Sequence, residues 1–170
     1  MDALEAMRSR RSVREFSDKP IPKEAIEQMV DCGRLAPTAR GEEPWEFVVV
    51  TDKAMLRTLG EVCDHGPFLR DAAAALVISC RETKYYLEDG CAATENILVA
   101  ASALGLGACW VAGDKKPYAE RVRGLLGLPG GHKLISILAL GYPEKPPAVK
   151  KKRSLSSVLH WGSYRAPERP

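Results

Sequence analysis

The sequence EDGCAATENILVAASALGLGACWVAG, residues 88–113, decides how the rest of the chain can be arranged. From Cys91 to Leu104 the residues are nearly all small or aliphatic and cover every face of a helix, and a helix that is apolar all round is typical of a protein interior. Gly105 and Gly107 follow as a C-terminal cap. Residues 108–112 then predict a short strand. We therefore expect a buried central helix that leads through a tight turn into a strand.

A membrane span is the alternative for this stretch, because residues 96–113 carry no charge. Two glycines would break such a helix near its middle, and Glu95 and Asp114 flank it closely. No asymmetry of lysine and arginine frames it either. The residues therefore favour a buried helix, and we expect no membrane contact.

The composition is that of one globular domain. The chain has 170 residues, of which 45% are hydrophobic and 28% are charged, enough to bury a core. Its formal net charge of +3 is too small to indicate a nucleic-acid partner. The five cysteines are scattered without a CxxC pair, which argues against a disulfide framework or zinc site and favours a reducing compartment. The N-terminus lacks the apolar core of a signal peptide, so we expect a cytoplasmic protein.

A basic segment follows the first predicted helix, residues 2–10. Arg10, Ser12 and Arg14 occupy alternate positions and would project to one side of an extended segment, with Arg11 beside them. Guanidinium groups and a hydroxyl are donors that suit the oxygens of a phosphate. On these residues alone, two interpretations remain open: a phosphate-binding segment and a solvated basic turn.

A second candidate site is the loop APTARGEEPW, residues 36–45, which runs straight into a predicted strand at 47–51. Its small side chains and stiff backbone would let the main chain approach a flat ligand closely. His65 and His132 have no second histidine or acid at metal-ligand spacing, so no metal site is predicted. Hydrophobic periodicity predicts helices at 22–33, 53–62 and 115–126 and strands at 76–80 and 133–140.

Four motifs in order, RRSVREF, APTARGEEPWEFVVV, GLGACWVAG and LHW, resemble the FMN-dependent nitroreductase family in a short form without the long helical insertion. The resemblance covers almost the whole chain and favours a phosphate-binding role for residues 10–14. It implies an α+β sandwich, with a mostly antiparallel central sheet flanked by helices, in an intertwined homodimer. Residues 1–165 would form a single domain. Within it, residues 144–165 would be a dimer-crossing arm, whose apolar side chains have no obvious partner in their own chain.

The resemblance also assigns roles to residues from distant parts of the chain. It implies that FMN lies at the subunit interface and that main-chain amides near Ala112 and Gly113 face flavin N5. The residues that would contact the cofactor are Arg10, Arg11, Ser12, Arg14, Pro37, Thr38, Ala39, Gly41, Glu43, Trp110, Val111, Ala112, Gly113, Lys151 and Arg153. The substrate side would be lined by Phe68, Tyr85 and Tyr86.

Two positions depart from the family pattern, and two basic residues near the C-terminus have an alternative role. Gly41 and Glu43 stand where relatives usually have an asparagine and a glutamine that reach the polar edge of the flavin. Glu43 would still accept a hydrogen bond from flavin N3, but its charge opposes the negative charge of the reduced ring. We therefore expect a lowered flavin potential if an ionised Glu43 faces the ring. Lys151 and Arg153 would complete the phosphate site or form part of a solvated basic run.

The expected chemistry belongs to the cofactor. The sequence has no evident pair of nucleophile and base and no glycine-rich phosphate loop, as expected where a cofactor supplies the chemistry. The resemblance implies that NAD(P)H reduces the flavin, which passes hydride from N5 to a nitroaromatic, a quinone or another small electron-poor acceptor in a ping-pong cycle. Dehalogenation, azoline oxidation, flavin fragmentation and flavin binding without turnover remain alternatives. The modest charge disfavours a nucleic-acid binder.

Overall fold

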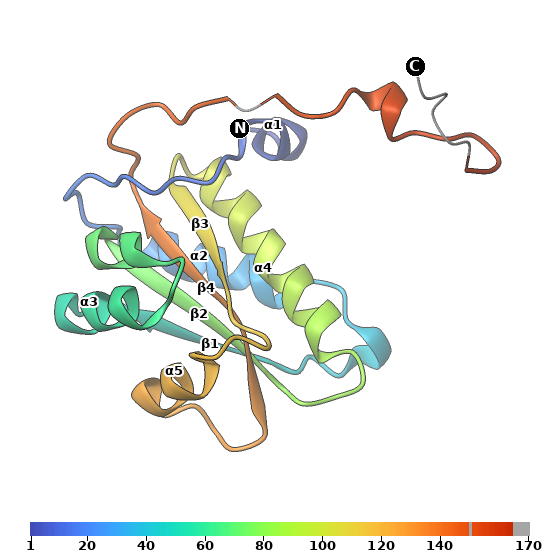
Figure 1. Cartoon of the computed structure of the whole chain (residues 1–170). Coiled ribbons are helices and arrows are strands. Elements are labelled where there is room, and N and C mark those ends of the chain that lie inside the picture. Colours follow the sequence, from blue (N-terminus) through green and yellow to red (C-terminus); the bar gives the residue numbers. More distant parts are fainter. Residues whose placement is uncertain (150, 165–170) are drawn as a thin grey trace.

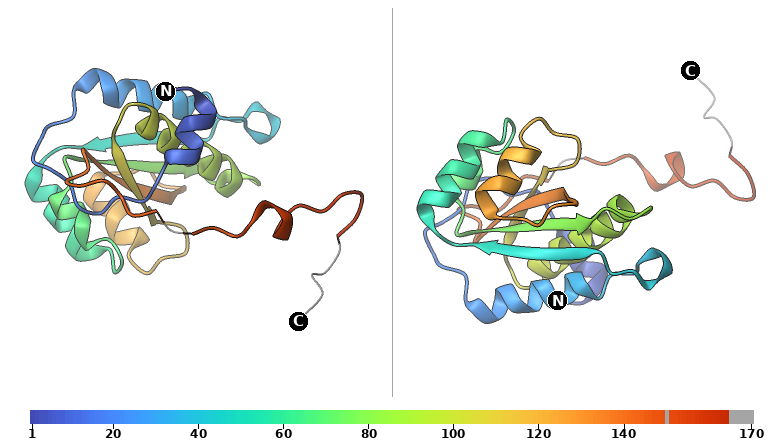
Figure 2. Two further views of the ribbon diagram at one scale, coloured as in Figure 1. Left: turned by 90° about the horizontal axis from the view of Figure 1, so that it is seen from above. Right: turned by 90° about the horizontal axis from the view of Figure 1, so that it is seen from below.

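The computed structural model describes residues 1–149 and 151–164 as one sheet with helices on both faces (Figures 1 and 2). Position 165, the predicted end of the domain, and Lys150 of the basic tail lie outside the described residues. In chain order the elements are α1 (Ala3–Ser9), α2 (Lys23–Arg34), η1 (Ala39–Gly41), β1 (Trp45–Val50), α3 (Lys53–Val62), η2 (Pro67–Asp71), β2 (Ala74–Arg81), α4 (Tyr86–Ala103), β3 (Gly107–Ala112), α5 (Ala119–Leu126), β4 (His132–Gly141) and η3 (Leu155–Ser157).

The four strands form an antiparallel sheet in the order β1-β2-β4-β3. The central strands β2 and β4 are buried almost throughout, whereas β1 and β3 are the edges. The predicted α+β fold with an antiparallel sheet between helices is confirmed.

Two hydrophobic clusters fill the spaces on either side of the sheet. Alternate residues of a strand point to opposite faces. Accordingly, Leu76 and Ile78 of β2 pack into the cluster under α2 and α4, while Ala75 and Val77 pack into the cluster under α3 and α5. Figure 2 shows the same division, with α2 and α4 on one side of the sheet and α3 and α5 on the other.

The predicted central helix is α4, which begins at Tyr86 rather than at Cys91. The acidic residues Glu88 and Asp89 lie in its first turn, where negative charge is favourable. After the cap at Leu104, Gly105 has a left-handed φ of 73°, as predicted for the end of the helix. The predicted helix at 115–126 is shorter, because residues 113–116 form a turn in which the Lys116 amide donates to the Gly113 carbonyl.

The chain after β4 leaves the body as an extended arm (Figure 1). Large apolar side chains of this arm are solvent-exposed in the single chain, among them Leu155 at 72% and Trp161 at 82%. Across residues 1–149 and 151–164, no helix has the length and apolarity that crossing a bilayer requires. The same residues contain no cluster of three or more His, Cys, Asp or Glu side chains that could hold a metal ion.

Candidate functional site

The basic segment after α1 lies along the outer edge of β3. The Val13 amide donates to the Ala108 carbonyl at 3.0 Å, and Ser12 pairs with Ala108 in a parallel bridge. Val13 is 7% exposed, and a Cβ on Gly107 would lie 2.7 Å from the Val13 Cβ, so the close approach requires a glycine. Since alternate residues point to opposite sides, Ser12 and Arg14 face outward.

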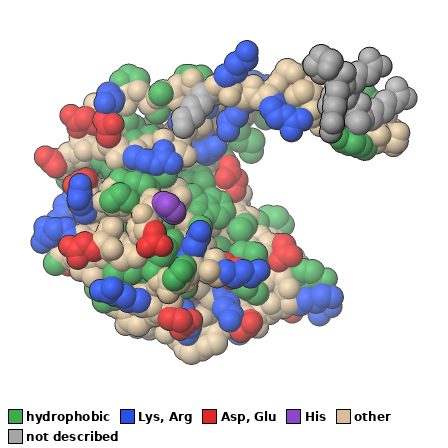
Figure 3. Space-filling view, viewed as in Figure 1, with side chains coloured by type: hydrophobic (Ala, Val, Ile, Leu, Met, Phe, Trp, Pro, Cys, Tyr) green, Lys and Arg blue, Asp and Glu red, His purple; other side chains and the backbone are tan. Residues whose placement is uncertain are grey.

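The outward side chains line a small cavity of about 130 Å³. Its walls come from the N-terminal segment and from the arm, two parts of the chain that are distant in sequence. Figure 3 shows lysine and arginine side chains along the arm and where it leaves the body. The cavity is lined by Arg10, Arg11, Ser12, Arg14, Ala148 and Lys152. The sequence prediction that the residues of the 10–14 segment face one site therefore agrees with their placement.

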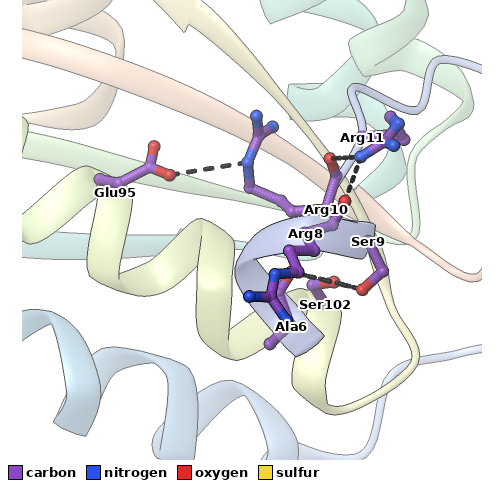
Figure 4. Close-up of polar contacts among 7 residues, drawn as sticks. All are labelled: Ala6, Arg8, Ser9, Arg10, Arg11, Glu95 and Ser102. Atoms are coloured by element: carbon purple, nitrogen blue, oxygen red, sulfur yellow. Dashed lines mark hydrogen bonds and ion pairs between the residues drawn. The ribbon is translucent and has the colours of Figure 1, made fainter. Parts of the chain in front are cut away.

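Two arginines of the cavity, Arg10 and Arg11, have different partners (Figure 4). Arg10 Nε lies 3.6 Å from Glu95 Oε1. Arg11 Nη1 donates to the carbonyls of Arg8 at 2.7 Å and Arg10 at 2.8 Å, so this side chain satisfies the C-terminal end of α1. Its buried Nε has no hydrogen-bond partner among the described residues. An orphaned donor beside three cations and a hydroxyl fits a phosphate group, whose oxygens accept hydrogen bonds.

The arm contributes Lys152 to this cavity, and neither Lys151 nor Arg153 lines it. Arg153 Nη2 instead donates to the Ser157 carbonyl. The physical reason is that consecutive residues of an extended segment point to opposite sides, which separates Lys152 from its neighbours. Within the single chain the arm therefore offers Lys152 to this cavity, while the contribution of Lys151 and Arg153 to a phosphate site across the expected dimer stays a prediction.

The edge of β3 offers main-chain donors at alternate positions. The Gly113 amide donates to the Ile135 carbonyl at 2.9 Å. Antiparallel pairing alternates, so Val111 bonds inward like Gly113, while Trp110 and Ala112 turn their amides to the open edge. The side chain of Val111 is 3% exposed in the core under α3 and α5, and Trp110 packs against the opposite core. Val111 can therefore meet a ligand at the edge only through its main chain, whereas the side chain of Trp110 stays partly exposed.

In the single chain the Gly113 amide is engaged by β4, so Ala112 is the better placed of the two predicted main-chain donors. The glycine is needed for packing within the chain: a Cβ at this position would lie 2.5 Å from Leu134 Cγ and 2.9 Å from the Ile135 carbonyl carbon. The Ala112 amide takes over as the candidate donor. Its own carbonyl accepts a hydrogen bond from the Tyr118 hydroxyl, whose pKa burial raises to about 12, so this hydroxyl remains protonated at neutral pH.

The loop at 37–43 is held in a strained conformation. Positive φ angles of 62°, 66° and 43° occur at Arg40, Gly41 and Glu43, and two of these residues are not glycine. The Ala39 amide donates to Asp89 Oδ1 at 2.9 Å. Asp89 is 3% exposed, and its Oδ2 has no partner among the described residues. Asp89 was not among the predicted site residues, although a carboxylate in the first turn of an otherwise apolar helix is a signal that indicates such a role.

The predicted contacts Pro37, Thr38, Ala39, Gly41 and Glu43 lie far from the phosphate-binding candidates within one chain. Asp89 holds this loop at the first turn of α4, whereas the hydroxyl of Ser102 in the last turn lies 3.3 Å from that of Ser9, beside Arg10. The 13 residues from 89 to 102 correspond to about 20 Å at 1.5 Å per residue. The structure therefore does not bring the two groups together in a single copy.

The three predicted substrate-side residues also separate. Phe68 lies beneath the Arg14 guanidinium at 5.6 Å, at the phosphate end. Tyr85 lies 5.9 Å from Arg40, near the loop. The Tyr86 hydroxyl donates to Asp114 Oδ1 at 2.9 Å. Partial burial and, to a smaller extent, this hydrogen bond raise the pKa of Tyr86 to about 12.

Fold and site together define an α+β protein with a cationic pocket beside an open strand edge. Residues 7–90 and 64–142 match the model of the nitroreductase family, and the chain belongs to this family. An Archaeoglobus fulgidus protein, provisionally named NADH dehydrogenase/NAD(P)H nitroreductase, is 40% identical over 152 residues, which are 84% of this chain and 86% of that protein.

Two solved structures agree with this assignment. A Bacteroides thetaiotaomicron protein with the same provisional name has a TM-score of 0.90 at 33% identity, over 95% of this chain and 98% of that chain. The FMN-dependent nitroreductase of Clostridium difficile has a TM-score of 0.86 at 28% identity, over 95% and 99%. The predicted family and oxidoreductase class are confirmed.

Proposed function

We propose that the chain is an FMN-dependent NAD(P)H oxidoreductase that transfers hydride through flavin N5 to a nitroaromatic, a quinone or a similar electron-poor acceptor by a ping-pong cycle. The observation that carries this proposal is the cationic cavity of Arg10, Ser12 and Arg14 beside the open edge of β3. FMN combines a phosphate with a planar ring, and its presence in the name of the Clostridium difficile relative supports it as the cofactor. When bound, FMN supplies the hydride chemistry.

The protein's own contribution is binding and orientation. Arg14, Lys152 and the Ser12 hydroxyl supply donors for a phosphate from two segments that only the fold brings together. Six residues of β3 carry the main chain away from this cavity to Ala112. The Ala112 amide is a donor that does not titrate and whose position the sheet fixes, as required of a group that stabilises charge at a reacting atom.

We further propose a cytoplasmic homodimer, in which the second copy completes each site. A groove of about 550 Å³ runs between α1, α2 and α4 and is lined mainly by apolar side chains, among them Met7, Leu35 and Val99. Met7 and Leu35 are 57% and 64% exposed in the single chain, which is unfavourable for large apolar groups in water. A second chain would cover this groove, receive the apolar arm and bring its own loop at 37–43 to the phosphate-binding half.

The dimer is tested with Leu159→Ser combined with Trp161→Ser in the arm, where the wild-type side chains are 44% and 82% exposed. Because neither side chain is buried in the single chain, the substitutions should leave each subunit folded. Light scattering after size-exclusion chromatography should then give a smaller mass than for the wild type, together with loss of flavin. A wild-type mass equal to one chain contradicts the proposed dimer.

The enzyme activity is tested on purified protein. We expect a yellow protein that releases FMN on denaturation, is bleached by NADH or NADPH without oxygen, and regains its colour when menadione is added. Chromatography of the released cofactor distinguishes FMN from FAD. Folded protein that is colourless and takes up no added FMN contradicts the proposal. Colour without bleaching identifies a flavin-binding protein that does not turn over.

A further inference from the structure

A second cationic cavity, of about 270 Å³, lies beyond the other end of β3. It is enclosed by the first residue of α4, the turn after β3, the α5 helix and the start of β4. Four basic and two acidic side chains line it. They are Lys115, Lys116, Arg123, Lys133, Asp114 and Glu120. No role for this cavity follows from the phosphate-binding site at the opposite end of the strand.

The acidic side chains of the cavity are already engaged. Both oxygens of Glu120 accept hydrogen bonds from Arg123 Nη1, at 2.7 and 2.6 Å. Asp114 Oδ1 accepts a hydrogen bond from the Tyr86 hydroxyl at 2.9 Å. Lys133 pairs with Glu82 outside the cavity at 3.2 Å.

Lys115 and Lys116 remain as cations for which no ion pair is found among residues 1–149 and 151–164. In this part of the chain neither lysine is paired with a carboxylate, so both can meet an anion from outside the chain.

The backbone around the two lysines supports an anion as well. Both α4 and α5 begin at this cavity, and neither N-cap residue, Tyr85 or Tyr118, makes a side-chain cap hydrogen bond. Amides at a helix start carry partial positive charge, which adds to the charge of the lysines.

We propose that this cavity binds a phosphate monoester of the reductant, the 2′-phosphate of NADPH, through Lys115 and Lys116. The inference rests on the proposed function, because it places the dinucleotide beside the edge of β3. Lys115 follows Ala112 by three residues, which span at most about 10 Å, and the turn at 113–116 shortens this distance. A dinucleotide whose nicotinamide lies at the Ala112 edge therefore has its adenosine end within reach of the cavity. NADH lacks the phosphate, so the lysines would discriminate between the two reductants.

The test compares binding of 2′,5′-ADP and 5′-AMP to the oxidised, FMN-loaded protein by calorimetry, which needs no turnover. We expect 2′,5′-ADP to bind at least about tenfold more tightly in the wild type, since a charge-assisted hydrogen bond to phosphate is among the stronger polar contacts. In a variant with Lys115→Gln and Lys116→Gln, this preference should disappear. Lys23→Gln, an exposed lysine on α2 that pairs with Glu27, is the matched control and should retain it.

Steady-state kinetics provides the second measurement. The double variant should raise KM for NADPH about tenfold and leave kcat and KM for NADH unchanged. Equal binding of both nucleotides to the wild type, or an unchanged preference in the double variant, overturns the inference. Competition of 2′,5′-ADP with the electron acceptor but not with NADPH also overturns it, because the anion then belongs to the acceptor. Absence of turnover with either reductant contradicts the proposed function, while the calorimetry still decides whether the cavity binds the phosphate.

Discussion

Replacing Asp89 should loosen the loop at 37–43 while the rest of the fold stays intact. Oδ1 of this buried carboxylate accepts the Ala39 amide at 2.9 Å, and a hydrogen bond to a charged group contributes about 1.5–3 kcal/mol. The loop it holds contains Arg40 and Glu43 in left-handed conformations, each of which costs about 1–2 kcal/mol for a residue with a side chain. The Asp89 bond is therefore of the same size as the strain that it opposes.

Two substitutions at this position should differ for a definite reason. Asp89→Ala removes the acceptor, and we expect the free energy of unfolding to fall by about 1–3 kcal/mol. Asp89→Asn keeps an acceptor for Ala39 and replaces Oδ2, which lacks a partner among the described residues, by a donor. Its loss should be below about 1 kcal/mol, the value of a neutral hydrogen bond.

Urea denaturation measures these losses through the midpoint at constant slope, and hydrogen exchange of residues 39–43 measures the loop itself. We expect exchange to accelerate in Asp89→Ala and to remain close to wild type in Asp89→Asn. Glu88→Ala is the control, because Glu88 is an exposed acid in the same turn of α4. Equal losses for Ala and Asn, or a loop that stays protected in Asp89→Ala, would refute the reasoning that this hydrogen bond holds the strained loop.

Three further predictions concern the cofactor site and the thiols. Arg14→Gln should weaken FMN binding about tenfold in a fluorescence titration, and Arg57→Gln, an exposed change on α3, should not; equal affinities would exclude Arg14 from the phosphate site. If the proposed dimer brings an ionised Glu43 to the flavin, Glu43→Gln should raise the flavin midpoint potential in a redox titration, because it removes a negative charge near the ring; an unchanged or lower potential contradicts that placement. Burial and, to a smaller extent, the negative charge of Asp64 raise the pKa of the Cys63 thiol from 9.0 to about 11. Since the folded state then holds this proton more tightly, its contribution to stability is complete below pH 9 and is lost as pH rises towards 11. Cys63→Ala should flatten that part of the pH–stability curve, and an unchanged slope would assign it to other groups.

Local sequence was sufficient for elements whose pattern depends on near neighbours. The predicted helix at 53–62 coincides with α3, because Leu59 and Val62 lie on one face and the Asp52 side chain caps the start. Roles that depend on tertiary pairing could not be read in this way. Whether Gly113 presents its amide to a ligand depends on which neighbour strand it faces, and that is fixed by β4, far along the chain.

The apolar composition of α4 also indicates a surface that a second chain could cover. The sequence predicted burial on every face, yet in one copy only the inner face is fully buried, at Ala93, Ile97 and Ala101. The opposite face, with Val99 and Ala103, lines the open groove. A helix that is apolar beyond what its own sheet can cover is therefore evidence for a covering surface, which under the proposed function is a second copy.

The two cationic cavities give the β3 edge a charge pattern that suits a two-substrate site. One cavity lies against Ala108 at the start of the strand, and the other begins at Asp114, just beyond its end. Among the described residues, the edge between them offers the uncharged main-chain N–H and C=O groups of Trp110 and Ala112. Because phosphates are attracted to opposite ends, a cofactor phosphate and a reductant phosphate need not compete for the same cations. Their uncharged rings are then directed to the same short stretch of edge, where hydride transfer requires them to be in contact. In this arrangement, salt should weaken the binding of NADPH more than that of NADH, because only NADPH carries the phosphate proposed to bind in the second cavity.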